Sequence, residues 1–234
     1  IAADSDPWST MSYQAIARKY RPETFADVVG QTHVTGTLRA AMRKDKLSHA
    51  YLFSGPRGCG KTTVARLLAK AINCQTNREG DPCGTCDTCV GIAKGNYLDV
   101  LEIDAASNTG VDNIRDLREM AQYSPSEGSS RVFIIDEVHM LSKGAFNALL
   151  KILEEPEEKT VFLLVAENDE TIPLTILSRT QLVKVNRLTD DDVHRGLSMS
   201  PEVDTKVVKM VTHRAEGNYR LALQLLEEED PDAD

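Results

Sequence analysis

The chain has 234 residues, of which 41% are hydrophobic and 27% are charged, which is typical of a soluble globular protein with a real core. Its net charge of −9 argues against a stand-alone nucleic-acid binder that depends on a large basic field. No apolar run approaches the ~20 residues of a membrane span, and no secretory signal is visible. We therefore expect a cytoplasmic protein.

The first residues of the chain carry little structural signal. Residues 1–10 lack a periodic pattern and Met11 resembles a natural start, so we interpret the preceding stretch as a remnant outside the fold. Residues 13–20 favour a helix, which Arg21-Pro22 ends. Residues 31–44 then predict an amphipathic helix with apolar side chains on one face.

A nucleotide-binding signature follows the apolar stretch 50–53, which predicts a strand. The pattern Gly-x-x-x-x-Gly-Lys-Thr leads into a helix-forming run over residues 62–71. Glycines let the backbone wrap a phosphate chain, and the helix N-terminus offers its N–H groups. Lys61 would neutralise the β- and γ-phosphates and Thr62 would bind Mg²⁺, whereas a chance glycine-rich turn would not need the flanking strand and helix. The expected nucleotide-binding residues of this loop are Gly55, Pro56, Arg57, Gly58, Cys59, Gly60, Lys61, Thr62 and Thr63.

Residues 74–95 interrupt the alternation of strands and helices with a polar insertion. Its cysteines have the spacing Cys-x8-Cys-x2-Cys-x2-Cys, and their thiolates could close a tetrahedral zinc site with a structural role. An iron–sulfur cluster is the alternative, although the close downstream Cys-Pro of ferredoxin-type runs is missing. The remaining cysteine, Cys59, is interpreted as a small residue that fills the glycine-rich turn. The predicted zinc ligands are Cys74, Cys83, Cys86 and Cys89.

The rest of the first 185 residues continues the alternation. Four further apolar runs predict strands, at residues 98–103, 131–135, 160–166 and 181–185. Helical patterns separate them, at residues 112–123, 143–153 and 173–177. Together these elements predict an α/β fold over residues 11–185, with a parallel five-stranded sheet covered on both faces. Residues 187–228 predict a small all-helical domain, and residues 229–234 an acidic tail.

Two acids end the apolar run Val132 to Ile135, at the sheet edge where α/β folds place ligands. Asp136 would hold Mg²⁺ through water, and Glu137 would polarise the water that attacks the γ-phosphate. Two solvated acids at a strand end are the simpler interpretation, but a glycine-rich phosphate loop in the same chain favours the catalytic one. Two arginines, Arg179 and Arg220, could also reach a γ-phosphate, although spacing alone supports neither role strongly.

Six segments together resemble a known family, the gamma/tau subunits of bacterial DNA polymerase III. These subunits are the ATPases of the sliding-clamp loader and belong to the AAA+ proteins. The resemblance covers roughly Met11 to Leu226, and the insertion with four cysteines is among its more specific marks. The segments are Tyr20-Arg21-Pro22, Val28-Val29-Gly30-Gln31, residues 49–58, Glu102 to Asn108, Asp136 to Leu141 and Phe146 to Lys151.

The resemblance implies an AAA+ fold with a helical lid, and it implies roles that the motifs alone do not give. Arg21, Pro22 and Val29 would lie near the adenine of ATP. Arg179 would act in trans on the ATP of the next subunit, and Arg220 would be a sensor in the lid. ATP binding would open the ring-shaped beta clamp at primed DNA. The implied partners are the delta and delta-prime subunits, other gamma/tau copies, the clamp and primer–template DNA, while this piece alone is expected to be monomeric.

Two departures from the family pattern affect the expected activity. The family's Ser-Arg-Cys is Ser178-Arg179-Thr180 here, which keeps the arginine. The strand that normally ends in Ala-Thr-Thr ends in Ala166-Glu167-Asn168, so the threonine that senses the γ-phosphate is missing, although Asn168 could substitute. Two alternatives therefore stay open: a nucleotide-gated scaffold subunit with little turnover, and a zinc module that binds DNA directly, which the acidic charge disfavours.

Overall fold

The computed structural model describes residues 21–76, 79–198 and 205–229, so the expected helix over 13–20 and residues 230–234 of the acidic tail lie outside it. Its centre is a sheet of five strands in the order β2-β3-β4-β1-β5. Every neighbouring pair of strands is parallel, as the sequence predicts. The strands are β1 (Ala50–Ser54), β2 (Val100–Asp104), β3 (Arg131–Asp136), β4 (Thr160–Ala166) and β5 (Gln181–Lys184).

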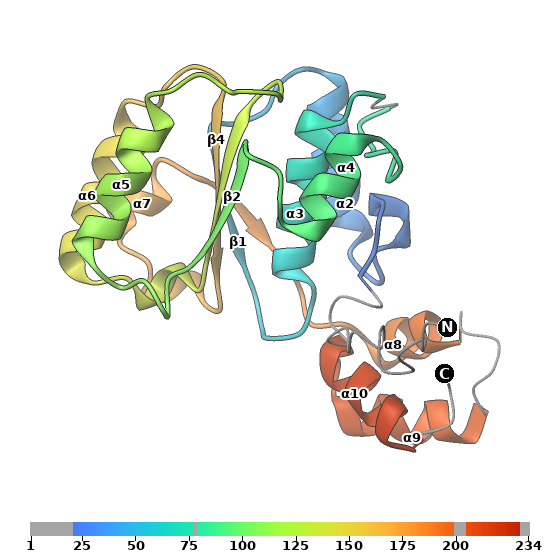
Figure 1. Ribbon diagram of the computed structural model, residues 1–234. Helices are drawn as coiled ribbons and strands as arrows, with labels where there is room; N and C mark the ends of the chain where they lie inside the picture. Colours follow the sequence, from blue (N-terminus) through green and yellow to red (C-terminus); the bar gives the residue numbers. More distant parts are fainter. Residues whose placement is uncertain (1–20, 77–78, 199–204, 230–234) are drawn as a thin grey trace, which may run out of the picture.

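Helices cover both faces of this sheet (Figure 1). One face carries α5 (Val111–Ala121), α6 (Lys143–Glu154) and α7 (Leu174–Leu177). The other carries α2 (Thr32–Arg43), α3 (Lys61–Asn73) and α4 (Asp87–Lys94). Helix α4 is an addition to the sequence analysis, which gave the cysteine segment no helix. It forms because Cys89 and Ile92 bury one side of this otherwise polar stretch against α3.

Side chains that alternate along the central strands build a separate core on each face, because successive strand residues point to opposite sides. Phe133 of β3 and Phe162 of β4 stack with ring centroids 5.2 Å apart and pack toward α5 and α6. Ile134 and Leu163, their neighbours in sequence, pack toward α3 instead. Strands buried on both faces explain why β3 and β4 are continuous apolar runs in the sequence.

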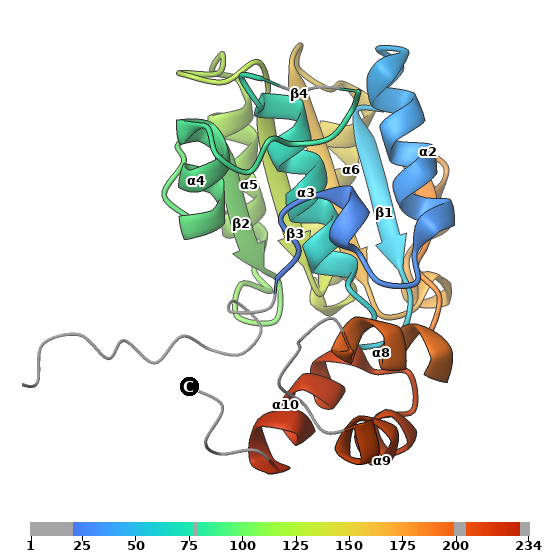
Figure 2. The same cartoon turned by 90° about the vertical axis from the view of Figure 1, so that its right-hand side faces the viewer.

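The C-terminal part is helical and has an apolar core of its own. It comprises α8 (Asp190–Leu197), α9 (Thr205–Ala215) and α10 (Tyr219–Glu229). Thr189 and Asp192 form a capping box that fixes the start of α8. Figures 1 and 2 show these helices below the sheet, beside the loop that joins β1 to α3. Among the described residues, no helix combines the length and apolar character that a membrane span requires.

Candidate functional site

The loop between β1 and α3 is closed by its own lysine. Lys61 is 8% exposed, and its ammonium donates to the carbonyl oxygens of Gly55 and Pro56 at 2.7 Å each. The cation therefore lies inside the loop, where phosphate oxygens could replace the two carbonyls as its partners. The thiol of Cys59 also faces inward, 2.8 Å from the carbonyl of Pro56, and burial raises its pKa. This geometry fits the sequence-based view of Cys59 as a packing residue.

The first turn of α3 lies next to the acids at the end of β3. The hydroxyl of Thr62 donates to Oδ2 of Asp136 at 2.9 Å, across 74 residues of sequence. The other carboxylate oxygen of Asp136 accepts the backbone N–H of Glu137 at 2.9 Å. A hydroxyl and a carboxylate are hard oxygen ligands suited to Mg²⁺, which commonly takes a few protein oxygens together with phosphate oxygens. The two residues that the sequence assigned to magnesium are thus adjacent.

Glu137 has an uncommon backbone conformation, with φ of 50°. A residue other than glycine in the left-handed region is strained, and such strain is concentrated at functional sites. The turn directs the Glu137 carboxylate toward His139, whose Nε2 lies 3.4 Å from Oε2. Both groups lie at the carboxyl edge of the sheet, on the same side as the loop of Lys61.

The C-terminal helices contact the same loop directly. The backbone N–H of Tyr219 donates to the carbonyl of Gly58 at 3.1 Å, at the start of α10. A Cβ on Gly58, whose φ is 74°, would lie 1.7 Å from the side-chain oxygen of Asn218, so only glycine allows this approach. Arg220 is the next residue along α10 and is exposed. Val29 packs against the apolar core of the C-terminal helices, so the structure brings Val29, Arg220 and the loop to one region.

Arg21 and Pro22 lie farther along α3. With Thr63 and Leu67 they line a cavity of about 70 Å³, to which α4 contributes Ile92. The Nε atom of Arg21 is buried and has no hydrogen-bond partner. A buried donor without a partner is costly and suggests that a ligand would complete the site.

The end of β4 meets the same loop through charged side chains. Ala166 pairs with Ser54 of β1, and the Glu167 carboxylate that follows lies 3.1 Å from Nε of Arg57. Asn168 caps a 3₁₀ turn, accepting the N–H of Glu170 at 3.0 Å. The position at which the family pattern has threonines thus carries a carboxylate paired with the phosphate-binding loop.

Arg179 lies at the opposite edge of the sheet. Its guanidinium donates to the Glu154 carboxylate at 2.7 Å and to the carbonyl of Thr175 at 2.8 Å. Arg179 and Glu154 border an open groove of about 710 Å³ at the amino ends of β1 and β5. Since β1 has five residues, the two edges are separated by roughly 16 Å at about 3.3 Å per residue. The structure therefore does not bring Arg179 to the loop of its own chain.

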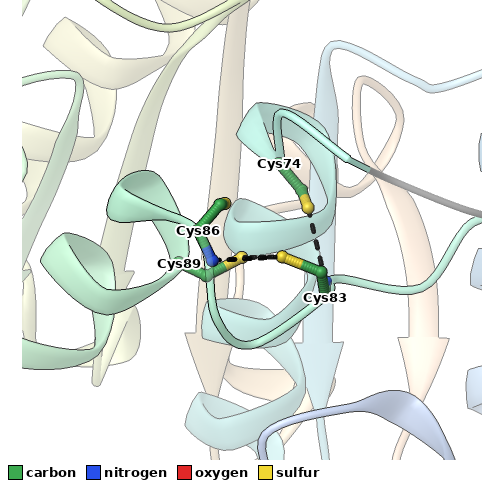
Figure 3. Close-up of side chains that lie close together, drawn as sticks. All are labelled: Cys74, Cys83, Cys86 and Cys89. Atoms are coloured by element: carbon green, nitrogen blue, oxygen red, sulfur yellow. Dashed lines mark hydrogen bonds between the residues drawn. The ribbon is translucent and has the colours of Figure 1, made fainter.

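Four cysteines of the α3–α4 segment converge on one point (Figure 3). The sulfur atoms of Cys74, Cys83, Cys86 and Cys89 all lie within 4.8 Å of one another. A tetrahedral site with Zn–S bonds of about 2.3 Å has sulfur–sulfur edges of about 3.8 Å, and the Cys83 and Cys89 sulfurs are 3.9 Å apart. The donor set thus fits a single zinc ion better than an iron–sulfur cluster, whose several metal atoms would hold the ligands farther apart.

Two of these thiols differ in acidity. The Thr76 hydroxyl and, next, the Cys86 backbone N–H donate to the Cys83 sulfur and lower its pKa to about 5. Burial raises the pKa of Cys89, which is fully enclosed. The backbone N–H of Cys83 lies 3.3 Å from the sulfur of Cys74. The backbone N–H of Cys86 lies 3.3 Å from the sulfur of Cys83. Such donors stabilise thiolates, the form that binds metal.

Comparison with known proteins identifies the family. A family model described as "DNA polymerase III, delta subunit" matches residues 30–189. This chain belongs to that family. Within it, the sequence is 48% identical over 223 residues to DNA polymerase III subunit tau of Bacillus subtilis, covering 93% of this chain and 40% of the relative. It is 47% identical to subunit tau of Escherichia coli over 93% of this chain and 35% of the relative.

The resemblance to gamma/tau subunits of DNA polymerase III is therefore confirmed. A shorter relative, subunit gamma of Buchnera aphidicola, is 43% identical over 93% of this chain and 62% of its own length. The chain thus spans less than half the length of the two tau subunits and more of the shorter gamma subunit.

The solved structures agree on the fold. Thermotoga maritima RuvB, titled a Holliday junction branch migration motor, superposes with a TM-score of 0.61 at 19% identity, over 89% of this chain and 64% of that one. Similarity at this level of identity concerns architecture alone. It confirms the AAA+ type of α/β fold, with a helical C-terminal part.

The sequence analysis did not identify several residues that contact the predicted site residues. Asn218 contacts Gly58, Glu154 holds Arg179, and Asp169 accepts from the Ser54 hydroxyl at 3.0 Å. Ser54 and Asp169 are 115 residues apart in sequence, and only the β1–β4 pairing brings them together. An acid after a buried strand was the available signal for Asp169, and the Gly-Asn pair before α10 was the signal for Asn218.

Proposed function

We propose that this chain is the ATP-binding and hydrolysing motor part of a DNA polymerase III clamp loader, which loads the sliding beta clamp onto primed DNA. The single observation that carries the proposal is the hydrogen bond from Thr62 to Asp136 at 2.9 Å. It joins the phosphate-binding loop to the acids of β3, the two parts that an ATPase of this class needs in one place. The family relationship supports the polymerase III setting.

The carboxyl edge of the sheet would bind ATP. Lys61 would exchange its loop carbonyls for the β- and γ-phosphate oxygens, while the N–H groups at the start of α3 would hold the remaining charge. Thr62 and Asp136 would hold Mg²⁺, which neutralises charge that develops on the phosphates. Glu137 would accept a hydrogen bond from the attacking water. Arg220, next to the Tyr219 contact with Gly58, would link the angle of the C-terminal helices to the bound phosphate.

Arg179 would serve a different copy of the chain. Its place at the amino edge, roughly 16 Å of strand from its own loop, favours a role in trans on the ATP of a neighbouring subunit. Glu154 would hold the guanidinium ready, at 2.7 Å. The partners in this proposal are other gamma/tau copies, the delta and delta-prime subunits, the clamp and primer–template DNA. Zinc in the cysteine site would have a structural role, and the chain alone would be monomeric.

A second function is favoured by one observation at the end of β4. The Glu167 carboxylate lies 3.1 Å from Arg57 of the phosphate-binding loop, where the family pattern has a threonine. A negative charge there would oppose a developing phosphate charge, so the chain could instead be a nucleotide-gated scaffold with little turnover.

The deciding experiment measures ATP turnover by the full-length protein assembled with its loader partners, with and without clamp and primed DNA. Strong stimulation by both supports the motor. Glu137→Gln should then abolish the stimulated rate while ATP binding persists, because it keeps the shape of the side chain and removes the base. Tight ATP binding without stimulated turnover, unaffected by Glu137→Gln, would support the scaffold instead.

A further inference from the structure

The segment before α2, residues 21–30, forms a strap across the nucleotide side of the molecule. Figure 2 shows it crossing α3 on the way to α2, close to α4. Pro22 lines the cavity beside Thr63 and Leu67 of α3, and Val29 packs on the C-terminal helical core. Because Val29 packs on the C-terminal helices, whose Tyr219 N–H contacts Gly58 of the phosphate-binding loop, the position of the strap would affect nucleotide affinity.

The strap is held from outside by the cysteine module, residues 74–95. The backbone N–H of Phe25 donates to Oδ1 of Asp81 at 2.8 Å, across 56 residues of sequence. Asp81 also lies 3.1 Å from Nε of Arg39 on α2, so its carboxylate bridges the strap and that helix. The Phe25 side chain is 2% exposed, and its partly buried N–H would be left without a partner if Asp81 moved away.

The cysteine module also contacts α2 in the two residues before Asp81. Nε of Arg43 donates to the carbonyl of Glu79 at 3.0 Å. A Cβ on Gly80, whose φ is 85°, would lie 2.6 Å from the carbonyl oxygen of Arg39, so this stretch lies directly on α2. Ile92 of α4 lines the same cavity as Pro22.

Asp81 stands two residues before Cys83, one of the four converging sulfurs. A polar segment of this kind has little apolar core, and a bound metal would supply the free energy that orders it. Ordering of the cysteines therefore fixes Asp81, and Asp81 fixes the N–H of Phe25 in the strap. The route from the cysteines to the strap runs through these contacts, and Val29 continues it to the C-terminal helices beside the phosphate-binding loop.

We propose that the cysteine module is an allosteric support of the nucleotide pocket: Asp81 is a positioning residue that couples metal occupancy to ATP affinity. The inference rests on the proposed nucleotide function. Coupling of two sites is reciprocal in binding free energy, so metal binding should strengthen ATP binding and ATP should strengthen metal binding by the same factor. Couplings of this kind are about 5- to 150-fold in binding constant, and we expect about tenfold here.

The first test titrates a chromogenic chelator into the unsubstituted, zinc-loaded chain and measures its zinc affinity at equilibrium. Saturating Mg-ATP should raise this affinity about tenfold, and the effect should disappear in Asp81→Ala. A zinc affinity of the unsubstituted chain that does not depend on ATP overturns the proposal. Because the readout is zinc affinity, a residue with a merely structural role would not make it depend on ATP.

The second test compares ATP affinity by calorimetry in matched variants. Asp81→Ala should weaken binding about tenfold while keeping its zinc, and Cys86→Ser should lose zinc and weaken binding to a similar extent. The double variant should be no worse than Cys86→Ser, because both changes break one route. Asp81→Asn retains an acceptor for the Phe25 N–H and should restore most of the affinity.

The control is Asp87→Ala, which removes an exposed carboxylate in the first turn of α4 in the same module. It should leave ATP affinity unchanged, and an effect equal to that of Asp81→Ala would overturn the proposal. Failure of the inference is distinct from failure of the proposed function. If Lys61→Ala abolishes ATP binding but Asp81→Ala and Cys86→Ser do not weaken it, only the coupling is wrong. If Lys61→Ala has no effect, the nucleotide site itself is wrong.

Discussion

The carboxyl and amino edges of the sheet differ in what they present, although the same strands form both. The carboxyl edge gathers Lys61, Thr62, Asp136 and the Tyr219 contact around one loop. At the amino edge, Arg179 is paired with Glu154 beside an open groove. A ligand at the first edge cannot touch the arginine of the second within one chain. In the proposed function, the chain would therefore carry two halves of a site that is completed between copies.

The two edges also differ in how their charges are stabilised. At the amino edge, Asp99 is fully buried and accepts three backbone N–H groups, as well as Nη2 of Arg131 at 3.2 Å. At the carboxyl edge, Lys61 is also buried, but it relies on two neutral loop carbonyls. A charge paired with an opposite charge of the protein stays in place, whereas a cation held only by neutral carbonyls can exchange them for the charged oxygens of a ligand.

The largest expected effect is a loss of ATP turnover when the arginine of the amino edge is removed and the carboxyl edge is left intact. Arg179→Ala should lower ATP turnover in the assembled loader by about 10³- to 10⁵-fold, the range for an arginine supplied in trans. The affinity of the isolated chain for ATP should not change, since Arg179 lies away from its own loop. Steady-state turnover and calorimetry measure the two quantities. A large loss of affinity in the isolated chain would mean that the edges communicate within one copy.

Next in size is the loss of the loop cation. Lys61→Ala should weaken Mg-ATP binding by about 4 kcal/mol, roughly 10³-fold, because a desolvated phosphate loses a charged partner. Calorimetry on the isolated chain gives the affinity, and thermal unfolding checks that the fold persists. Lys94→Ala is the control, since this lysine is exposed at the end of α4. Equal losses in both variants would point to general electrostatic attraction instead of a specific contact.

The buried pair of Asp99 and Arg131 at the amino edge should contribute to the free energy of unfolding. Asp99→Asn should lower the free energy of unfolding by about 3 kcal/mol, because it leaves the buried Arg131 guanidinium without its charge partner. Chemical denaturation measures the loss. Asp112→Asn alters an exposed acid paired with Arg115 and should cost less than about 0.5 kcal/mol. A loss of similar size in both variants would contradict the assignment.

The stabilisation that Asp99 provides should depend on pH, and the direction of its pKa shift gives the sign. Burial opposes the charge of Asp99, but its three backbone donors and Arg131 outweigh burial and lower its pKa. A lowered folded-state pKa means that the stabilisation is complete above the unfolded value of about 3.9 and is lost as the pH falls through the folded value. The difference between the unsubstituted chain and Asp99→Asn should therefore shrink below about pH 4. A difference that grows on acidification would show that the pKa is raised instead.

Features that depend on local sequence patterns were predicted correctly. The strands, their parallel arrangement and the phosphate-binding loop were predicted because each depends on local pattern, an apolar run or a fixed glycine spacing. The cysteine spacing likewise predicted the convergence of four sulfurs. The roles of Lys61, Asp136 and Glu137 in catalysis stay predictions until a nucleotide is bound and turned over.

The features that could not be predicted from the sequence depend mostly on contacts between distant segments. The link from Asp81 to Phe25 and the approach of Asn218 to Gly58 join residues that are far apart in the sequence, so no local pattern predicts that they meet. Helix α4 was missed for another reason. It has only eight residues, too few for a clear helical period, and a helix that short is stabilised by packing against α3 more than by its own propensity.

The smallest expected effect concerns the carboxyl edge at Glu167. The pair with Arg57 is exposed, with 71% of the Arg57 side chain and 45% of the Glu167 side chain accessible, so it contributes at most about 1 kcal/mol and is screened by salt. Glu167→Thr removes a negative charge beside the phosphate-binding loop and frees Arg57. ATP affinity should therefore rise by no more than about fivefold at low salt, and the gain should vanish at high salt.

Glu158→Gln is the matched control for this change, because it removes one exposed carboxylate near the amino edge. It should leave the affinity unaltered at both salt concentrations, since any long-range effect is screened over that distance. Turnover then separates the two proposed functions. If Glu167→Thr raises stimulated turnover much more than it raises affinity, the carboxylate opposes the chemical step and the native chain acts mainly as a scaffold. If both change by the same small factor, Glu167 acts only through Arg57, and the missing threonine does not limit the motor.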